Sequence, residues 1–304
     1  MALVVVLSLV SRSRASELPE SVIPAGMGVN IHFTRGHEAD LDLIKAAGFK
    51  FIRMDLGWGG VERQKGQYDW SATDELMAHL DQRQIRALWI LDYSNELYEL
   101  RVSSLDPITH KPTHVAPSPQ HPESVAAFAQ WAAAAAARYQ GRHVVWEIWN
   151  EPNISFWQPK PDVQQYTVLA RATVKAMRAA DPQATIIAPG TSEFPWEFLE
   201  QFLGSGLLAD LDGVSVHPYR QGNPETATAD FRRLCGLIAK LAPEGKKNLP
   251  IISSEWGYST QTKGLPLDRQ GSFLVRQHLS VPIRKWGKSA GLKMGFSSAG
   301  FSSE

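Results

Sequence analysis

Short apolar segments alternate with amphipathic segments along the chain from about residue 25 onward. Seven apolar segments have the length and flanking turn residues of buried strands: 27–32, 49–55, 86–91, 144–149, 184–188, 211–216 and 249–253. A stretch with helical periodicity follows each of them: 37–47, 72–83, 122–139, 163–180, 196–205, 224–241 and 268–279. Seven strand-then-helix units in series predict an α/β protein with a parallel sheet and helical crossovers.

The number of units distinguishes two parallel architectures. Open doubly wound sheets typically have five or six strands, whereas a (β/α)8 barrel of the TIM type takes about 250 residues. Seven evenly spaced units in 304 residues therefore predict the barrel. Residues 280–304 are rich in Gly, Ser and Lys, and 292–296 is only a weak strand candidate, so we expect the eighth βα unit to be degenerate or missing. A barrel left open there would expose strand edges and favour a homo-oligomer.

The first ten residues form an apolar run that is too short to span a bilayer. The run has the length of a signal-peptide core, and Ser13-Arg14-Ala15 resembles a cleavage site, although a positively charged start is missing. We therefore expect a signal peptide or disordered tail over 1–20, the catalytic barrel over 21–280 and an atypical tail over 281–304. A signal peptide would make the protein secreted or periplasmic.

Composition and charge narrow the classes of partner. The 31 basic and 31 acidic residues cancel, so no basic excess is available to neutralise nucleic-acid phosphates. The single cysteine, Cys235, excludes an internal disulfide, and its amphipathic context predicts a small buried hydrophobe. The nine histidines include no ligand spacing such as His-Glu-x-x-His, so we expect no metal and no other cofactor. No membrane partner is expected.

Polar and aromatic residues gather after the predicted strands, where the active site of such a barrel lies. They lie at the ends of six of the seven strands or directly after them: Asn30, His32, Arg53, Asp55, Trp58, Asp92, Tyr93, Asn95, Trp149, Asn150, Glu151, His217, Tyr219, Glu255 and Trp256. Glu151 and Glu255 stand out because each closes an apolar strand. Two opposed carboxylates can protonate a glycosidic oxygen and attack or stabilise the anomeric carbon. The pattern favours a glycosidase.

Two motifs carry a family resemblance. Trp149-Asn-Glu-Pro-Asn153 after the fourth strand and Ser254-Glu-Trp-Gly257 after the seventh resemble those of the clan A glycoside hydrolases, retaining (β/α)8 enzymes that include cellulases, β-mannanases and β-xylosidases. Phe156-Trp-Gln-Pro159 and Tyr166 look most like the family 39 and family 5 branches. The likeness runs from about residue 25 to residue 279. It implies a retaining hydrolase of β-linked oligo- or polysaccharides that acts through a glycosyl-enzyme intermediate.

The resemblance also implies roles for single positions. Glu151 would be the acid/base and Glu255 the nucleophile. Arg53 would keep Glu255 ionised, Tyr219 would orient it, and Asn150 would bind the 2-hydroxyl of the sugar. His217 and His32 would make polar contacts to the site and the substrate. Trp149 would form an apolar wall beside Glu151. The candidate platforms on which a sugar could stack are Trp256, Trp157 and Trp58.

Structural alternatives stand beside these roles. Arg53 could neutralise Glu147, which we interpret as a structural charge inside the barrel; His32 could be a core histidine, and Trp256 could simply be packing. The family's eighth strand usually ends in a tryptophan, and Trp286 is the only nearby candidate. A second hypothesis is therefore a catalytically impaired carbohydrate-binding protein on a truncated barrel. Whether the 92–120 loop walls off or lines the cleft, and hence exo or endo action, stays open.

Overall fold

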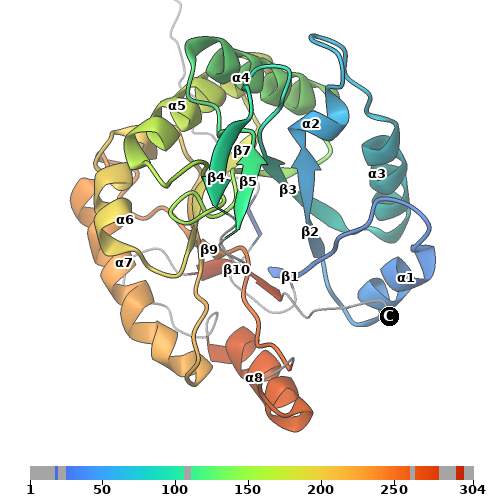
Figure 1. Ribbon diagram of the computed structural model, residues 1–304. Coiled ribbons are helices and arrows are strands. Elements are labelled where there is room, and N and C mark those ends of the chain that lie inside the picture. Colours follow the sequence, from blue (N-terminus) through green and yellow to red (C-terminus); the bar gives the residue numbers. More distant parts are fainter. Residues whose placement is uncertain (1–17, 20–24, 106–110, 261–263, 281–291, 298–304) are drawn as a thin grey trace, which may run out of the picture.

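The computed structural model describes residues 18–19, 25–105, 111–260, 264–280 and 292–297. Eight parallel strands close into a barrel in the order β1-β10-β9-β8-β7-β6-β3-β2, and helices surround it (Figure 1). The barrel strands are β1 Met27–Asn30, β2 Phe51–Gly57, β3 Arg86–Asp92, β6 Val145–Ile148, β7 Thr185–Ser192, β8 Gly213–His217, β9 Ile251–Ser253 and β10 Leu292–Ser297. The predicted (β/α)8 barrel is therefore confirmed.

The eighth unit is degenerate rather than missing. β10 pairs in parallel with β1, with Met27 opposite Gly295, and with β9, with Leu292 opposite Ile251. Within the described part of the chain, no helix follows β10. β10 pairs with the edges of β1 and β9 that we expected to be open. The homo-oligomer expected from an open barrel therefore loses its basis. Trp286 lies outside the described residues, as do residues 1–17 of the expected signal segment.

The helices form an outer ring: α1 Glu38–Ala46, α2 Trp58–Val61, α3 Ser71–Arg83, α4 Pro122–Arg138, α5 Val163–Ala180, α6 Trp196–Leu203, α7 Ala227–Leu241 and α8 Leu267–Ser280, with short 3-10 turns η1 Leu207–Ala209 and η2 Pro224–Thr226. Asp162 caps α5 by accepting hydrogen bonds from the backbone amides of Gln164 and Gln165. The alanine-rich α4 packs beside α5 and buries its small side chains. Cys235 on α7 is half-buried rather than buried, and burial raises the pKa of its thiol.

The amino end of the barrel interior is filled by apolar side chains. They come from five strands and from the segment before β1: Phe51, Leu88, Ile90, Val145, Ile187, Ile252 and Leu18. Gly213 leaves room there for Ile252, because a Cβ at this position would lie too close to Ile252 Cδ1 and the side chain would have to shift. The packed core thus begins at Leu18, two residues before the end of the expected tail.

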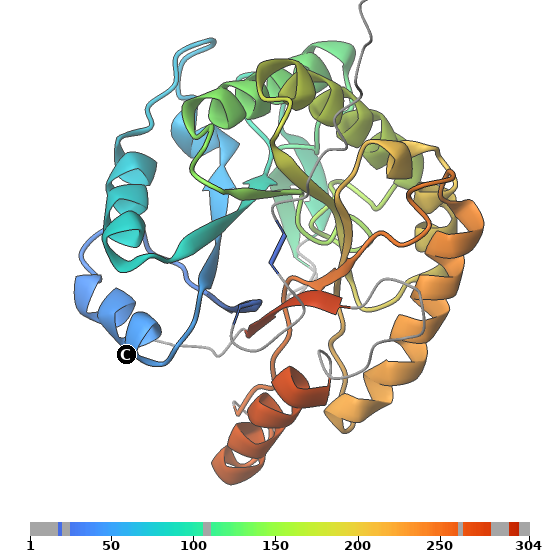
Figure 2. The ribbon, with the colours of Figure 1, turned by 180° about the vertical axis from the view of Figure 1, so that it is seen from behind.

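The long segment after β3 carries a hairpin that we did not predict. β4 Val102–Leu105 and β5 Pro112–Val115 pair antiparallel, with Val102 opposite Val115. The hairpin lies in front of the barrel mouth in Figure 1 and on the far side when the molecule is seen from behind in Figure 2. It therefore marks the carboxyl face of the barrel. Among the described helices, none is long and apolar enough to cross a membrane.

Candidate active site

Arg53 occupies the centre of the barrel mouth and binds four partners. From β2 its guanidinium donates to Glu147 Oε2 at 2.8 Å, Glu255 Oε2 at 2.8 Å and Asn150 Oδ1 at 2.9 Å. Its Nη2 also lies 3.2 Å from His217 Nε2. Burial alone would lower the pKa of Arg53, but the charges of Glu147 and Glu255 outweigh it and raise that pKa. Arg53 is thus a permanent cation around which the site is built.

Glu147 is the structural partner of this cation. It is fully buried on β6, and Ser254 Oγ donates to its Oε1 at 2.6 Å. Gly190 on β7 has a φ of +60°, and a Cβ there would lie 3.0 Å from Glu147 Oε1. The structure therefore shows the ion pair with Glu147 and the contact with Glu255 together, so the two interpretations of Arg53 do not exclude each other.

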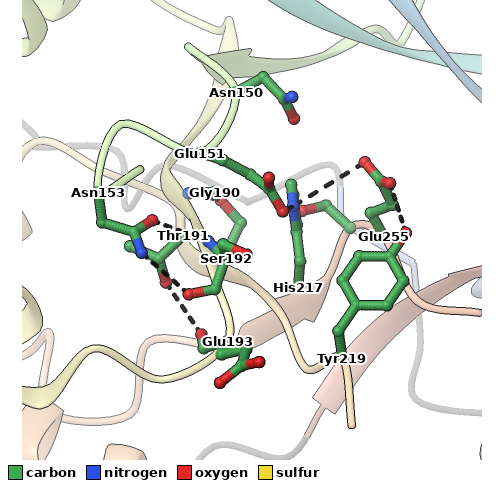
Figure 3. Close-up of polar contacts among 12 residues, drawn as sticks. Asn150, Glu151, Asn153, Gly190, Thr191, Ser192, Glu193, His217, Tyr219 and Glu255 are labelled. Carbon is green, nitrogen blue, oxygen red and sulfur yellow. Dashed lines mark hydrogen bonds and ion pairs between the residues drawn. The ribbon is translucent and has the colours of Figure 1, made fainter. Parts of the chain in front are cut away.

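His217, at the end of β8, connects the two candidate glutamates. Its Nδ1 lies 2.8 Å from Glu151 Oε1 and 3.9 Å from Glu255 Oε2 (Figure 3). Arg53 can only donate, so His217 Nε2 must accept, and the ring hydrogen sits on Nδ1. We infer this tautomer from the partners. His217 therefore donates to Glu151 Oε1 and leaves Glu151 Oε2 for another proton.

The backbone around Glu151 is held in an unusual conformation. Trp149 has a φ of 66° and Glu151 a φ of 49°, values that side chains with a Cβ rarely adopt. The Glu151 amide donates to the carbonyl of Gly190 at 2.9 Å. Such positions persist only where surrounding contacts enforce them, and they cluster at functional sites. The conformation is part of what aims Glu151 at His217.

Two further contacts fix the loops around Glu151. The side chain of Asn153 exchanges two hydrogen bonds with the backbone of Ser192, at 2.9 and 3.1 Å (Figure 3). The amide of Glu193 donates to the carbonyl of His217 at 2.8 Å. The segments after β6, β7 and β8 are thereby tied together, which makes the position of Glu151 rigid.

Glu255 follows β9 and is held as a carboxylate. Tyr219 Oη donates to its Oε1 at 2.5 Å, and Arg53 donates to its Oε2. Burial alone would raise the pKa of Glu255, but the charge of Arg53 and the hydrogen bonds from Tyr219 and Arg53 lower it. Its side chain remains 22% exposed, so a substrate can reach it.

Asn150 is fixed by both ends of its amide. Its Oδ1 accepts from Arg53, and its Nδ2 donates to Tyr93 Oη at 2.9 Å. Tyr93 stacks on Phe156, with ring centroids 5.7 Å apart, and both rings are partly exposed. Sequence analysis gave Tyr93 no role. Its place after an apolar strand had singled it out, but no motif indicated what it contacts.

The tryptophans do not lie where we expected them. Trp58 and Trp157 are fully buried and Trp256 nearly so, so none is an open sugar platform. Trp58 begins α2 and stacks on Trp131 of α4, because its ring points outward under the helices. For Trp256 the packing alternative is correct. Trp149 is also buried: its ring packs edge-on against Tyr93 and forms an apolar layer behind the mouth.

Two further points concern the position of His32 and the possible ligands of a metal ion. His32 is exposed after β1, so it is not a core histidine, and no contact with the two glutamates is seen among the described residues. In the same part of the chain, no group of three or more His, Cys, Asp or Glu side chains could hold a metal ion.

The sequence was compared with known families and solved structures. The sequence model of the cellulase family, glycosyl hydrolase family 5, matches residues 20–279. No curated protein matches the chain. A family 39 glycoside hydrolase from Bacteroides cellulosilyticus is 24% identical with a TM-score of 0.71, and the match covers 93% of this chain and 56% of that one.

Two other solved structures share the fold. A family 39 β-xylosidase from Caulobacter crescentus is 21% identical, with a TM-score of 0.67 and coverage of 93% of this chain and 64% of that one. An endoglucanase from Thermotoga maritima is 18% identical, with a TM-score of 0.58 and coverage of 91% and 90%. The chain thus spans a little over half to two thirds of the two family 39 proteins. These structures share the barrel, and the match over residues 20–279 shows that the chain belongs to the cellulase family of clan A glycoside hydrolases.

Proposed function

We propose that this protein is a retaining β-glycoside hydrolase with Glu151 as acid/base and Glu255 as nucleophile. The observation that carries the proposal is the position of His217 Nδ1 between the two carboxyls, 2.8 Å from one and 3.9 Å from the other. The nearest oxygens of Glu151 and Glu255 cannot be farther apart than these two lengths combined. Retaining enzymes place their carboxyls about 5–5.5 Å apart and inverting enzymes about 6.5–9.5 Å. A bound of about 6.7 Å admits the retaining distance and leaves only the shortest end of the inverting range.

The surroundings suit two different protonation states. Glu255 has a lowered pKa and stays ionised beside Arg53, as a nucleophile must. Glu151 is buried, and His217 occupies its Oε1. Its transferable proton therefore belongs on Oε2. Two carboxyls in different environments are the usual basis for separate acid and nucleophile roles.

The reaction then runs in two balanced steps. Glu255 attacks the anomeric carbon while the glycosidic bond breaks, and the leaving oxygen takes the proton of Glu151 Oε2. Glu151, now a carboxylate, removes a proton from water, and the water oxygen displaces Glu255 from the same carbon. Asn150, held by Arg53 and Tyr93, is placed to bind the 2-hydroxyl in both steps.

We propose β-linked oligo- or polysaccharide as the substrate. The family match and the fold shared with a β-xylosidase and an endoglucanase support this class. The exposed rings of Tyr93 and Phe156 offer the mouth an apolar surface for a sugar. The β4–β5 hairpin in front of the mouth favours a cleft that is bounded on that side (Figure 1).

A non-catalytic carbohydrate-binding protein was the alternative. It rested on a missing eighth unit, and β10 supplies that strand. The alternative therefore loses its ground.

The stereochemical course of hydrolysis tests the proposal. Aryl β-xylosides, β-glucosides and β-mannosides are incubated with the protein, and NMR follows the first sugar released. We expect retained β-configuration; an inverted first product would contradict the paired roles. Glu151→Ala should lose most activity on poor leaving groups and much less on activated aryl groups, because the latter need no proton. Glu193→Ala, which removes an exposed carboxylate at the same mouth, is the matched control and should show no such dependence.

We also propose that the protein is exported. The apolar run over residues 4–10 supports this, and the mass of the protein recovered outside the cytoplasm would test it. Cleavage after residue 15 would retain Leu18, which belongs to the packed core. A recovered protein with the full N-terminal mass would contradict the proposal.

A further inference from the structure

Two carboxyls at the barrel mouth have no part in the mechanism above. Asp92 is the last residue of β3 and is 0% exposed, whereas Asp55 on β2 is half-buried. Gly57 pairs with Asp92 and Asp55 with Ile90, so the two aspartates are diagonal neighbours on adjacent strands. Both share the strand parity of inward-facing residues, so their side chains project into the barrel as neighbours.

Among the described residues, no hydrogen-bond donor stabilises a negative charge on Asp92. Neither of its carboxyl oxygens has a donor among the described residues, and an ionised Asp55 has no proton to give. The nearby cation, Arg53, is already bound to Glu147 and Glu255. Burying a carboxylate without a partner is far more costly than protonating it.

The burial of Asp92 and the neighbouring Asp55 therefore favour a proton on this pair. Burial, and then the charge of Asp55, hold the pKa of Asp92 well above its usual range. The proton belongs on Asp92 because this side chain is inaccessible to water. Asp92 is then a neutral acid that donates to the Asp55 carboxylate and leaves the remaining acceptor sites of Asp55 open.

The pair lies across the mouth from the proposed nucleophile. In the closed ring of strands, β2 is opposite β8 and β3 is opposite β9, which is followed by Glu255. Asp55 lies two residues after Arg53 on the same face, one layer nearer the opening. Tyr93, next to Asp92 in the chain, binds Asn150. A sugar with its anomeric carbon at Glu255 therefore presents its far hydroxyls to β2 and β3.

We propose that Asp55, held in place by the neutral acid of Asp92, determines specificity by accepting a hydrogen bond from a sugar hydroxyl at the far side of the ring. The inference rests on the proposed hydrolase function and narrows its substrate class. A carboxylate at this position selects neutral sugars with a free hydroxyl there. It disfavours deoxy sugars, which cannot donate, and uronates or sulfated sugars, whose charge it repels.

The test uses p-nitrophenyl β-glycosides of the sugar that the wild-type protein hydrolyses best, with a series of monodeoxy analogues. Removing one far-side hydroxyl should lower kcat/KM of the wild type by about 10- to 100-fold, the worth of a hydrogen bond to a charged group. Asp55→Ala should lower kcat/KM on the parent by a similar factor and abolish the penalty for that one hydroxyl. The penalty for removing the 2-hydroxyl, assigned to Asn150, should persist.

Asp92 is a positioning residue and needs a different measurement. Asp92→Leu removes the donor and should lower kcat/KM, whereas Asp92→Asn keeps a donor and should restore most of the loss. Infrared difference spectra of wild type against Asp92→Asn, without substrate at neutral pH, should show the carbonyl band of one protonated carboxylic acid. Asp212→Asn is the control, because Asp212 is buried near the opposite barrel end beside Arg178; it should cost stability and leave the deoxy penalties unchanged.

Each outcome decides between the proposals. If the wild type hydrolyses the glycosides and Asp55→Ala loses the same factor in kcat/KM as the wild type for every removed hydroxyl, the specificity role alone is overturned. A missing carboxylic acid band would overturn the shared proton. A wild-type protein that hydrolyses none of the aryl glycosides would overturn the proposed function and the specificity role with it, and the infrared result would still report on the pair.

Discussion

The two ends of the barrel interior differ in the side chains that the same strands contribute. At the amino end, Phe51, Leu88 and Ile252 form part of a dry apolar floor. Two residues further along β2, Arg53 begins a network of buried charges. Residues two apart on a strand face the same side, so only a few ångströms of rise separate packing from chemistry. The floor can be rigid because it is apolar, and its rigidity supports the charged layer above it.

Glu255→Ala should have the largest effect and should affect the mouth alone. It removes the proposed nucleophile, so kcat/KM on aryl β-glycosides should fall at least about a thousandfold. Thermal unfolding and circular dichroism should show that the barrel still folds, because the floor is untouched. Glu244→Ala, which removes an exposed glutamate beyond α7, is the control. Turnover near the wild-type level would refute the role of Glu255.

Ile252→Ala should produce the converse result at the floor. Ile252 is fully buried, so its truncation should lower the free energy of unfolding by about 2–5 kcal/mol. Denaturant titration measures this loss. Activity per folded molecule should stay close to that of the wild type, since no charged contact changes. A selective loss of kcat with unchanged stability would show that the two ends are not separable.

Tyr219→Phe should change the pH dependence at the mouth. It removes one hydrogen bond that lowers the pKa of Glu255, so that pKa should rise. Activity requires the ionised form and is lost as pH falls through the folded-state pKa. The acidic limb of the kcat/KM profile should therefore move to higher pH, with about a 10-fold loss in kcat/KM.

Tyr258→Phe is the matched control for that change. The Tyr258 hydroxyl donates to the carbonyl of Gly222 instead of a carboxylate. Its removal should leave the acidic limb in place. If the acidic limb is the same in Tyr219→Phe and in the wild type, the hydrogen bond from Tyr219 does not lower the pKa of Glu255.

Leu18→Ala should have the smallest effect. Leu18 lies at the rim of the floor, so its truncation should lower the free energy of unfolding by about 1–2 kcal/mol and leave kcat/KM unchanged. Leu43→Ala, at an exposed position on α1, is the control and should change neither. An effect of Leu18→Ala no larger than that of Leu43→Ala would remove this residue from the floor.

Much of the fold could be predicted because its strands are continuous apolar runs. Seven of the eight barrel strands lie where such runs occur, and Leu292–Ser297 was ranked low because Lys and Gly interrupt it and Ser and Gly surround it. Its place is fixed by β1 and β9 on either side, and no local pattern shows such neighbours. The β4–β5 hairpin is also short and polar, so its pairing escaped the hydrophobic pattern.

The site was predictable to the extent that position along a strand determines it. Arg53, Glu151, His217 and Glu255 were found because they follow strands, and the structure brings them together. Asp92 closes an apolar strand by the same criterion and was named for it, but it received no role because no motif includes it. The direction of a tryptophan ring depends on side-chain rotamers and neighbouring helices, and no sequence pattern supplies it.

The pairing of β1 with β10 has a consequence for how the chain folds during synthesis. Met27 meets Gly295 across nearly the whole length of the chain, so the ring cannot close until the last strand has left the ribosome. Until then the nascent sheet keeps free edges on β1 and β9, both of which can pair with other chains. Synthesis that pauses before residue 292 would prolong that exposure and with it the risk of aggregation.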